Sequence, residues 1–381
     1  MGSGGKRALG QLQPVIGRLR GALQDETAAV PVEAPPGSVR DPSSKAQHIE
    51  VCLHEDVEYR KTSGFERFDF LNEACADLSL GHLDLAIRFA GRQLQVPLMI
   101  GPMTGGTPRA LEINRLLAGA AQRFGLAMGV GSQRVAIERA ELEPYFRVRD
   151  VAPDILLFAN IGAAQLARGW GAAEAMRAVR MIDADALFVH INPLQEAIQG
   201  GDRDFRHFAL RLTTLCRDLR SEGVPVYARE IGFGLSAVAA SRLADCGVDG
   251  LDCAGAGGTS WAKVEAFCAR TPERRALGQR FGEWGIPTSE SIRLVRSVAA
   301  SIPLIASGGL RSGLDLAKAL ALGADVGAMA RPMLLAAARG EAALHAFVES
   351  VITDLRVAMF AAGAASVAEL RGRLVPAFPS A

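Results

Sequence analysis

The stretch of this chain that says most about its fold is Ala186-Leu187-Phe188-Val189-His190-Ile191-Asn192-Pro193-Leu194-Gln195-Glu196. Its first four residues are apolar, which is typical of a buried strand, and Pro193 ends the extended segment. Polar side chains then follow in quick succession: His190, Asn192, Gln195 and Glu196. An imidazole, two amides and a carboxylate at one strand end suit a polar ligand, a metal ion, or both. Simple capping of a loop by the His and Asn side chains is the alternative.

Apolar, β-branched runs of this kind recur along the chain from about residue 95. The runs are Val96–Ile100, Leu126–Val130, Ile155–Ala159, Ala186–Val189, Val224–Ala228, Val248–Leu251, Ile302–Ala306 and Asp325–Ala328. Segments with helical spacing lie between them: Ala163–Arg180, Phe205–Glu222, Ser236–Cys246, Ser289–Ala300 and Gly313–Leu322. Eight buried strands, most of them followed by a helix, predict an α/β fold, a parallel (β/α)8 TIM barrel with an N-terminal extension. A doubly wound open sheet is the alternative.

The parts of the chain outside this repeat have a different character. Residues 1–45 are basic at first and then proline-rich, so we expect a disordered extension, with an organelle-targeting segment as the alternative. Residues 46–94 form a lead-in that contributes phosphate-binding residues and includes an expected helix near Phe70–Leu78. The barrel then covers 95–373, and Glu341–Gly363 is expected to be its closing helix.

Composition narrows the class of protein. The 42 basic and 41 acidic residues give a net charge of +1, so no basic field points to nucleic acid. No apolar run approaches the length that would span a membrane. The six cysteines form no CxxC pair, which favours buried thiols in a reducing compartment, and we expect a cytoplasmic protein. Barrel enzymes often associate, so we also expect a homo-oligomer.

Small and polar residues follow every predicted strand, at the end of a barrel where chemistry takes place. These loops are Gly101–Gly106, Gly131–Gln133, Asn160–Gly162, His190–Glu196, Arg229–Gly234, Gly255–Ser260, Ser307–Arg311 and Ala330–Pro332. Glycines after the last two strands let backbone N–H groups approach a phosphate, and a helix N-terminus there adds a favourable dipole. The polar residues after the first three strands can hydrogen-bond the edge of a flat ring. The combination predicts a flavin mononucleotide (FMN) site.

The ordered motifs resemble those of the type 2 isopentenyl diphosphate isomerases, a flavin-dependent family, from about Ser44 to Arg373. The matching motifs are Met103-Thr104-Gly105-Gly106, Gly131-Ser132, Asn160-Ile161-Gly162, His190 to Glu196 with Gly201-Asp202, Gly232-Phe233-Gly234, Gly255 to Trp261, Trp284 to Thr288, and Ser307-Gly308-Gly309 through Ala317 to Leu320. The resemblance implies isomerisation of isopentenyl to dimethylallyl diphosphate. In this family reduced FMN moves the protons, Mg²⁺ lies on the diphosphate, and NADPH reduces the flavin.

The resemblance also implies roles for individual residues. Flavin contacts are implied for Met103, Thr104, Gly105, Ser132, Asn160, Arg229, Thr259, Gly308, Gly309 and Ala330. Substrate contacts are implied for Lys45, His48, His190, Asn192 and Gln195, and a Mg²⁺ ligand for Glu196. Gln195, His190 and Arg229 would be catalytic. We expect Trp261 to pack under its own loop, and Asp202 to fix the loop that carries Glu196.

Two positions depart from the family pattern. The family has an arginine before the lysine that matches Lys45, and this chain has Ser44 there. The loss of one guanidinium from a phosphate site would weaken binding by about 1–3 kcal/mol. The family has a lysine where this chain has Arg229. Arginine keeps the positive charge but does not release a proton in a protein, so an electrostatic role survives and a proton-transfer role would not.

Three functions are compatible with these residues. The first is the isomerase itself. The second is a diverged FMN enzyme of the same barrel that acts on another prenyl or phosphorylated substrate or carries out redox chemistry. The third is a flavin-binding pseudoenzyme. Product formation under anaerobic conditions separates the first from the others.

Overall fold

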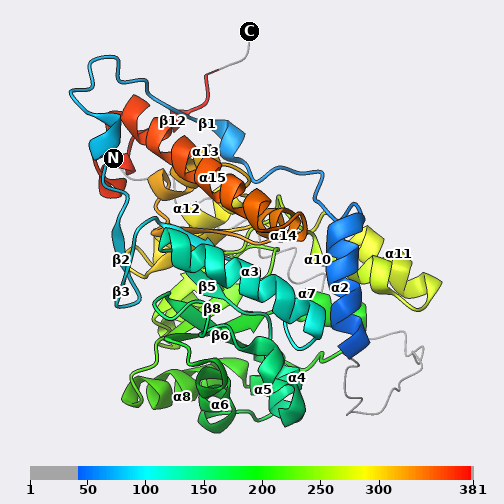
Figure 1. Ribbon diagram of the computed structural model, residues 1–381. Coiled ribbons are helices and arrows are strands. Elements are labelled where there is room, and N and C mark those ends of the chain that lie inside the picture. The colour runs from blue at the N-terminus through cyan, green and yellow to red at the C-terminus, as the bar shows by residue number, and fades with distance from the viewer. Residues whose placement is uncertain (1–41, 379–381) are drawn as a thin grey trace, which may run out of the picture. The chain divides into compact units, whose positions relative to one another are not determined.

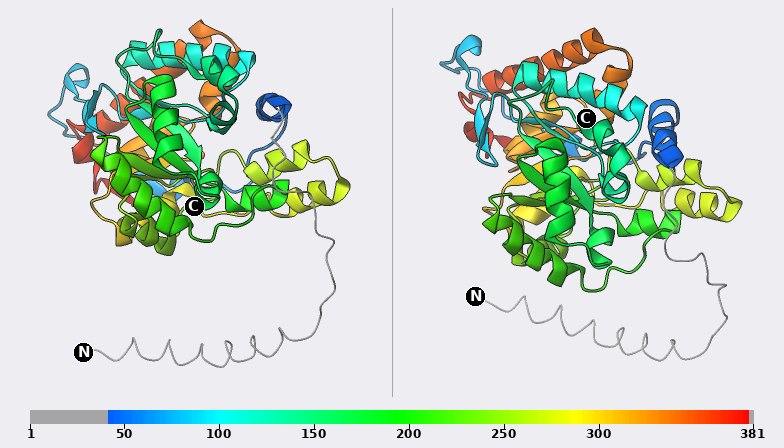
Figure 2. Two further views of the ribbon diagram at one scale, coloured as in Figure 1. Left: turned by 90° about the horizontal axis from the view of Figure 1, so that it is seen from below. Right: turned by 60° about the horizontal axis from the view of Figure 1, so that its bottom comes forward.

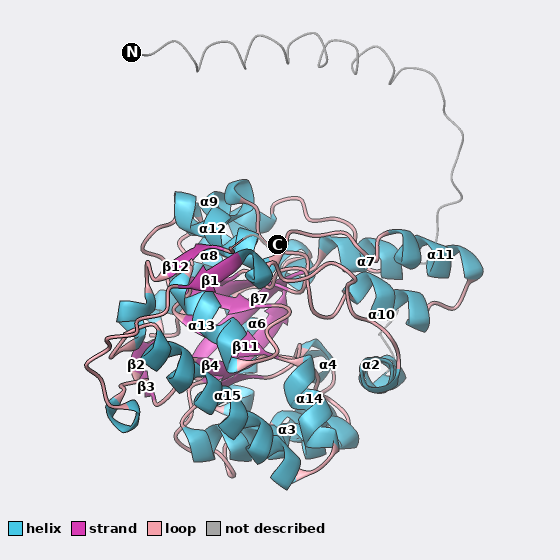
Figure 3. Ribbon diagram, turned by 90° about the horizontal axis from the view of Figure 1, so that it is seen from above, coloured by secondary structure: helices cyan, strands magenta, loops and turns pink. Residues whose placement is uncertain are grey.

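The computed structural model describes residues 42–378, and the barrel predicted from the sequence forms within them (Figure 1). Its strands are β4 (Leu98–Ile100), β5 (Ala127–Gly129), β6 (Leu157–Gly162), β7 (Ala186–Ile191), β8 (Val226–Glu230), β9 (Gly250–Asp252), β10 (Leu304–Ser307) and β11 (Val326–Met329). All neighbours are parallel, and β11 pairs with β4 to close the barrel. The (β/α)8 prediction is therefore confirmed, and the open-sheet alternative is excluded. Figure 3 shows the strands grouped at the centre with helices around them.

Helices follow the barrel strands around the outside. They are α3 (Pro108–Phe124), α4 (Arg134–Glu138), α5 (Ala163–Ala167), α6 (Ala172–Ile182), α7 (Pro193–Gln199), α8 (Phe208–Ser221), α9 (Ala237–Asp245), α10 (Trp261–Cys268), α11 (Pro272–Arg280), α12 (Thr288–Val298), α13 (Gly313–Ala321), α14 (Arg331–Ala338) and α15 (Glu341–Ala361). Many begin at a side-chain cap, as at α3, where the Thr107 hydroxyl accepts from the Ala110 amide and a proline takes the first turn. The closing helix predicted at Glu341–Gly363 is confirmed as α15.

Two helix predictions were wrong. The helix expected over Ala163–Arg180 is two helices, because Gly169 adopts φ +113° and Gly171 begins α6 as its N-cap. No helix forms near Phe70–Leu78. There the chain continues from β1 (Phe68–Phe70), which pairs with β12 (Leu374–Pro376), and the Glu73 amide donates to the carbonyl of Ala361. These backbone groups therefore bond to the C-terminal part of the chain instead of to a local helix.

The interior of the barrel is filled at its amino end. Phe158, Phe188 and Tyr227 pack there from three adjacent strands, with the Phe158 and Phe188 rings stacked at 4.3 Å. The antiparallel hairpin of β2 (Ile87–Phe89) and β3 (Arg92–Leu94) contributes Phe89 and Leu94 to the same cluster. This end is therefore filled by side chains, and the pocket lies toward the carboxyl ends of the strands.

The first described helix, α2 (Pro42–His54), lies beside α10 and α14 (Figure 1). Helices α7, α10 and α11 pack together on the same side of the barrel, as the views in Figure 2 also show. The predictions for residues 1–41 fall outside the described part of the chain. Within residues 42–378, no helix combines the length and apolar character needed to cross a membrane.

Candidate active site

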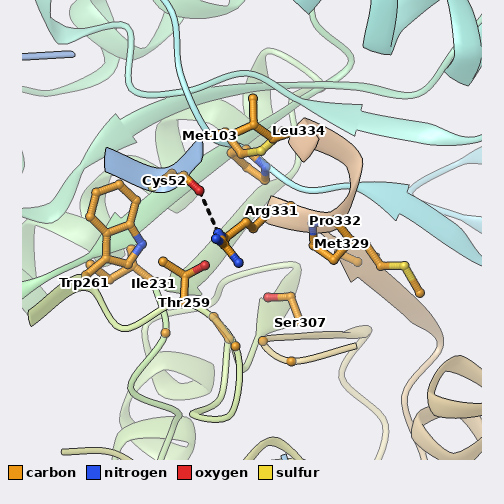
Figure 4. Close-up of a pocket in the computed structure, with 18 of the residues that line it drawn as sticks. Cys52, Met103, Ile231, Thr259, Trp261, Ser307, Met329, Arg331, Pro332 and Leu334 are labelled. Carbon is orange, nitrogen blue, oxygen red and sulfur yellow. Dashed lines mark hydrogen bonds between the residues drawn. The ribbon is translucent and has the colours of Figure 1, made fainter. Parts of the chain in front are cut away.

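A pocket opens at the carboxyl ends of the strands (Figure 4). It encloses about 930 Å³ of space between atoms, part of which is open solvent. The predicted site residues that line it are His48, Met103, Thr104, Arg229, Thr259, Gly308, Gly309 and Ala330. They come from α2, from β8 and from the loops after β4, β9, β10 and β11. The topology therefore brings together residues as far apart in the sequence as His48 and Ala330.

Backbone rather than side chains forms one wall of the pocket. Gly308 and Gly309 have φ values of +95° and +77°, a conformation that L side chains rarely adopt. A Cβ atom at Gly308 would lie 2.0 Å from the carbonyl oxygen of Gly255, so the loops after β9 and β10 pack main chain against main chain. Helix α14 begins at the same wall, where Ala330 and Pro332 line the pocket. A helix N-terminus and close-packed glycine backbone are typical of phosphate sites.

Two arginines that were not predicted to belong to the site lie at this wall. Arg331 Nη1 lies 2.7 Å from Glu58 Oε1, and Arg311 Nη2 lies 2.8 Å from Glu58 Oε2. All three residues line the pocket. In Figure 4 the Arg331 guanidinium points to the Cys52 carbonyl, to which its Nε donates at 2.7 Å. The sequence signal for them was their place in the segments that follow the last two strands.

Apolar side chains also line the pocket. Met103, Ile231, Met329 and Leu334 line it, and Figure 4 shows them on different sides of the same space. A flat ring bound there would contact these side chains while a phosphate on its tail reached the glycine wall and the arginines. The residues present therefore fit a flavin mononucleotide.

Three polar side chains occupy one level of the barrel. The strand register aligns Gly162 with His190, His190 with Arg229, and Arg229 with Asp252. The Arg229 Nη1 atom lies 2.5 Å from Asp252 Oδ2, and both side chains are buried. Asp252 Oδ1 also accepts from the Ser307 hydroxyl at 2.6 Å. Burial raises the pKa of Asp252, and the positive charge of Arg229 opposes that shift.

The tautomer of His190 follows from its neighbours. Asn160 donates from Nδ2 to the carbonyl of Val130 at 3.0 Å, which fixes the orientation of its amide. Its Oδ1 then faces His190 Nδ1 at 2.8 Å. Because an amide oxygen only accepts, Nδ1 of His190 carries the hydrogen in this pair. The geometry joins these two predicted site residues directly.

Helix α7 holds the polar cluster seen in the sequence. Asn192 Nδ2 donates to Gln195 Oε1 at 3.1 Å and to Glu196 Oε1 at 3.0 Å. The Asp202 backbone amide donates to Glu196 Oε2 at 2.9 Å, and the Asp202 carboxylate pairs with Arg168, so this segment is held beside Glu196 as expected. Asn192 Oδ1 is buried and has no hydrogen-bond partner in the described part of the chain. The cluster is thus preorganised, and it keeps an acceptor for a donor from outside.

A buried carboxylate, Glu265 of α10, connects the cluster to the pocket. Its Oε1 accepts from Gln195 Nε2 at 2.7 Å and lies 3.4 Å from His48 Nε2. The His48 ring meets Trp261 edge-on at a centroid distance of 5.5 Å, and both residues line the pocket. Trp261 also packs against a buried cluster that includes Ala256 of its own loop, so it both packs there, as expected, and lines the pocket. Glu265 could not be predicted from the sequence, because a glutamate on a helix is usually solvated. Its role becomes visible only from the packing of α2 and α7 against α10.

Other predicted site residues lie outside the pocket wall. Lys45 Nζ donates to the carbonyl of Ser132 at 2.6 Å and lies 5.1 Å from the centre of the Phe146 ring. A Cβ atom at Gly105 would overlap the Phe146 ring, so this glycine permits close packing of the loop after β4. Ser44 falls within α2, but its side chain is not among those described.

Metal binding by protein groups alone is not favoured. Among the described residues, no three His, Cys, Asp or Glu side chains are grouped in a way that could hold a metal ion. Glu196 supplies one carboxylate beside the amides of Asn192 and Gln195. Mg²⁺ commonly takes one or two carboxylates and completes its shell with water and phosphate oxygens. These residues therefore fit a magnesium ion that is shared with a diphosphate.

Glu230 closes the loop after β8 from within. Its Oε2 accepts from the backbone amides of Ile231, Gly232, Phe233 and Gly234 at 2.5 to 3.2 Å. Burial raises the pKa of this carboxyl group to about 7, although the four amides favour its charged form. The loop it holds contributes Ile231 and Gly232 to the pocket.

The chain is similar to a set of proteins with one name. It is 52% identical over 332 residues to isopentenyl-diphosphate delta-isomerase of Synechococcus sp., covering 87% of this chain and 94% of the relative. It is 48% identical over 336 residues to the protein of that name from Nostoc sp., covering 88% and 95%. The corresponding protein of Methanothermobacter thermautotrophicus is 44% identical over 330 residues, covering 86% and 90%.

More distant similarity concerns the fold. A family model described as FMN-dependent dehydrogenase matches residues 219–376. Among solved structures, an active mutant of (S)-mandelate dehydrogenase is 18% identical with a TM-score of 0.60, covering 88% of this chain and 98% of that chain. A flavocytochrome b2 mutant is 16% identical, also with a TM-score of 0.60, covering 87% and 82%. At these identities the likeness supports the barrel fold alone.

Proposed function

Because this chain belongs to the flavin-dependent, type 2 isopentenyl diphosphate isomerase family, we propose that it interconverts isopentenyl and dimethylallyl diphosphate. Reduced FMN, when bound, supplies the acid and base that move protons on the alkene. A Mg²⁺ ion held by Glu196 would neutralise the diphosphate, and NADPH would keep the flavin reduced, with no net redox change in the substrate. One observation carries the proposal: His48 lines the flavin-type pocket and, through Glu265, reaches Gln195.

The phosphate of FMN would lie against the wall of Gly308, Gly309 and the start of α14. This wall offers backbone amides, a helix dipole and the nearby guanidinium groups. Thr259 lines the same region, and Met103 and Thr104 line the part that suits the ring. Asn160, Ser132 and Gly105 lie just outside the pocket wall. We propose that Asn160 acts on the site through His190 and that Ser132 and Gly105 shape the adjoining loops.

The diphosphate would bind beside α7. A hydrocarbon tail offers few groups to hydrogen-bond, so binding energy must come mainly from the diphosphate and its metal. Glu196 is the metal ligand in this proposal, and its carboxylate is already oriented by Asn192 and Asp202. Lys45 and His48, from one face of α2, supply cationic or hydrogen-bonding contacts. The resemblance to the family implies an arginine as a third contact at this place, and this chain has Ser44 instead.

Gln195 would act closest to the reacting carbons. Its amide is held at both ends, by Asn192 on the oxygen and by Glu265 on the nitrogen. A side chain held in this way loses little rotational freedom when substrate binds, which favours the reactive geometry. His190 is set in one tautomer by Asn160 and would face the substrate.

Arg229 would act on the pyrimidine end of the flavin. It is always charged, and Asp252 fixes its position without removing it from the pocket wall. Its role is therefore electrostatic: it favours negative charge on a reduced flavin and does not transfer a proton.

The test is an anaerobic assay of the full chain with reduced FMN, Mg²⁺ and isopentenyl diphosphate. The proposal expects dimethylallyl diphosphate and no net consumption of NADPH beyond the amount that first reduces the flavin. Absence of product from protein that holds FMN would contradict it and favour the pseudoenzyme. NADPH oxidation in step with a new product would instead favour a redox enzyme of the same barrel. Gel filtration of the same sample tests the predicted homo-oligomer, and fractionation of the source cells tests the cytoplasmic location.

A further inference from the structure

The side chain of Glu58 occupies the two arginines at the phosphate end of the pocket. Its two carboxylate oxygens are shared out, one to Arg331 at 2.7 Å and one to Arg311 at 2.8 Å. These arginines follow β11 and β10, and the glutamate comes from the segment after α2. A single carboxylate from the N-terminal part of the chain thus bridges two cations that belong to the barrel.

The backbone around Glu58 is fixed, so its segment does not have to move for the carboxylate to leave. The Tyr59 amide donates to Gly258 at 2.9 Å, and the Ser260 amide donates to the carbonyl of Val57 at 2.8 Å. Lys263 also donates to the Glu58 carbonyl. The Glu58 side chain itself is 38% exposed. Rotation about its own bonds can therefore carry the carboxylate into water while the main chain stays in place.

The two arginines have separate supports that do not involve Glu58. Arg331 Nε donates to the carbonyl of Cys52 at 2.7 Å. Arg311 donates to the carbonyls of Gly309 at 3.2 Å and Gly257 at 3.0 Å. Loss of the carboxylate would leave both guanidinium groups near their present positions. Glu58 is therefore not needed to hold them, and its charge is its main contribution.

We propose that Glu58 is a placeholder anion, which pairs with Arg311 and Arg331 until the phosphate of a phosphomonoester takes over both contacts. This proposal rests on the FMN assignment made above. A phosphomonoester carries a charge of about −1.5 to −2 and three acceptor oxygens, so it can replace one carboxylate on two guanidinium groups. Because every anion must first displace the Glu58 carboxylate from the two arginines, Glu58 lowers the affinity of this site for all anions. A ligand such as FMN, which also binds the apolar pocket, tolerates that cost, and a small anion does not.

The test compares Glu58→Gln with the wild-type full chain after removal of flavin. We expect Glu58→Gln to bind FMN about three- to tenfold more tightly, because two ion pairs no longer have to be exchanged. Riboflavin, which lacks the phosphate, should bind both proteins equally. Inorganic phosphate should bind the variant more tightly than the wild type. Flavin fluorescence gives the two flavin affinities, and competition or calorimetry gives that of phosphate.

Two further variants serve as controls. Glu58→Asp keeps the charge and should stay close to wild type, whereas Glu55→Gln removes an exposed carboxylate that does not line the pocket and should change neither affinity. Unchanged or weaker FMN binding by Glu58→Gln would overturn the placeholder, as would an equal gain for riboflavin. If the wild type binds no FMN, the proposed function fails, and the phosphate measurement alone then decides whether Glu58 is a placeholder.

Discussion

The two ends of the barrel use carboxylates in different ways. At the amino end, Asp185, Asp249 and Asp325 each stand directly before a strand, and each accepts the backbone amide that begins the preceding barrel strand, at 2.8 to 2.9 Å. At the carboxyl end, Glu196 and Glu265 bond to side-chain amides and an imidazole around the pocket. Carboxylates at the amino end link neighbouring strands, and those at the carboxyl end orient the amide and imidazole side chains around the pocket. The comparison teaches that burial of an acid does not reveal its role, whereas the end of the barrel does.

The largest effect is expected where the carboxyl end is built from backbone. Gly308→Ala places a methyl group against the Gly255 carbonyl and strains a φ of +95°. Strain and overpacking together should lower the free energy of unfolding by about 2–6 kcal/mol and abolish FMN binding. Urea unfolding and flavin titration measure the two effects. Gly340→Ala is the matched control, because Gly340 has a similar φ of +104° with nothing within 4 Å. Equal losses in both variants would mean that strain alone, and not close packing at the wall, matters.

A charge removed at the carboxyl end should affect chemistry and leave stability nearly unchanged. Glu196→Gln keeps the shape of the side chain but removes the carboxylate assigned to Mg²⁺. We expect kcat/KM for isopentenyl diphosphate to fall about a hundredfold and the Mg²⁺ concentration for half-maximal activity to rise. The midpoint of urea unfolding serves as the control. A normal Mg²⁺ dependence in the variant would show that another group holds the metal.

The corresponding change at the amino end should have the opposite signature. Asp185 accepts from the Leu157 amide and pairs with Arg149 at 2.8 Å. Asp185→Asn weakens both contacts and should lower the free energy of unfolding by about 1–3 kcal/mol. The kcat/KM of the folded enzyme should not change. A variant of normal stability with impaired turnover would break the distinction between the two ends.

Most of the barrel could be predicted from the sequence because a buried parallel strand leaves a continuous apolar run. All eight predicted strands form, and the glycine-rich loops meet where expected. The break between α5 and α6 was missed because apolar spacing continues on both sides of Gly169 and Gly171. Around Phe70 the chain was misread because its partner strand, Leu374–Pro376, lies some 300 residues away.

Site residues could be predicted only where they belong to a recognisable sequence motif. Residues within the His190 to Glu196 stretch and the glycine loops were found in this way. Glu265 and Glu58 were not, because each depends on contacts between distant segments: Glu265 with α2 and α7, and Glu58 with Arg311 and Arg331. An isolated glutamate looks the same in sequence whether it is solvated or bridges two elements.

A pH effect is expected from Glu230, the buried acid at the end of β8. The pKa of Glu230 is raised from 4.5 to about 7, so the native protein keeps this proton at pH values where the unfolded chain has lost it. Unfolding then releases a proton, and this contribution to stability falls as the pH rises from about 4.5 to 7. The free energy of unfolding of wild type minus that of Glu230→Gln should fall by about 3 kcal/mol over this window and stay level above it. A difference that rises with pH would mean that the four amides hold the carboxylate charged.

The smallest effect is expected where the chain departs from its family at the carboxyl end. Arg229→Lys introduces the residue that the resemblance to the family implies at this position and keeps the positive charge beside Asp252. If the role is electrostatic, kcat/KM should change by no more than about threefold and its pH profile should keep its shape, whereas Arg229→Gln should lose about tenfold or more. The absorbance of the reduced flavin, followed against pH, gives a readout that does not depend on turnover: its ionisation should move to higher pH in Arg229→Gln and stay in place in Arg229→Lys. A new limb in the pH profile of Arg229→Lys would show that a lysine here transfers a proton, a step that arginine cannot supply. The wild-type enzyme would then use a different proton route from its relatives.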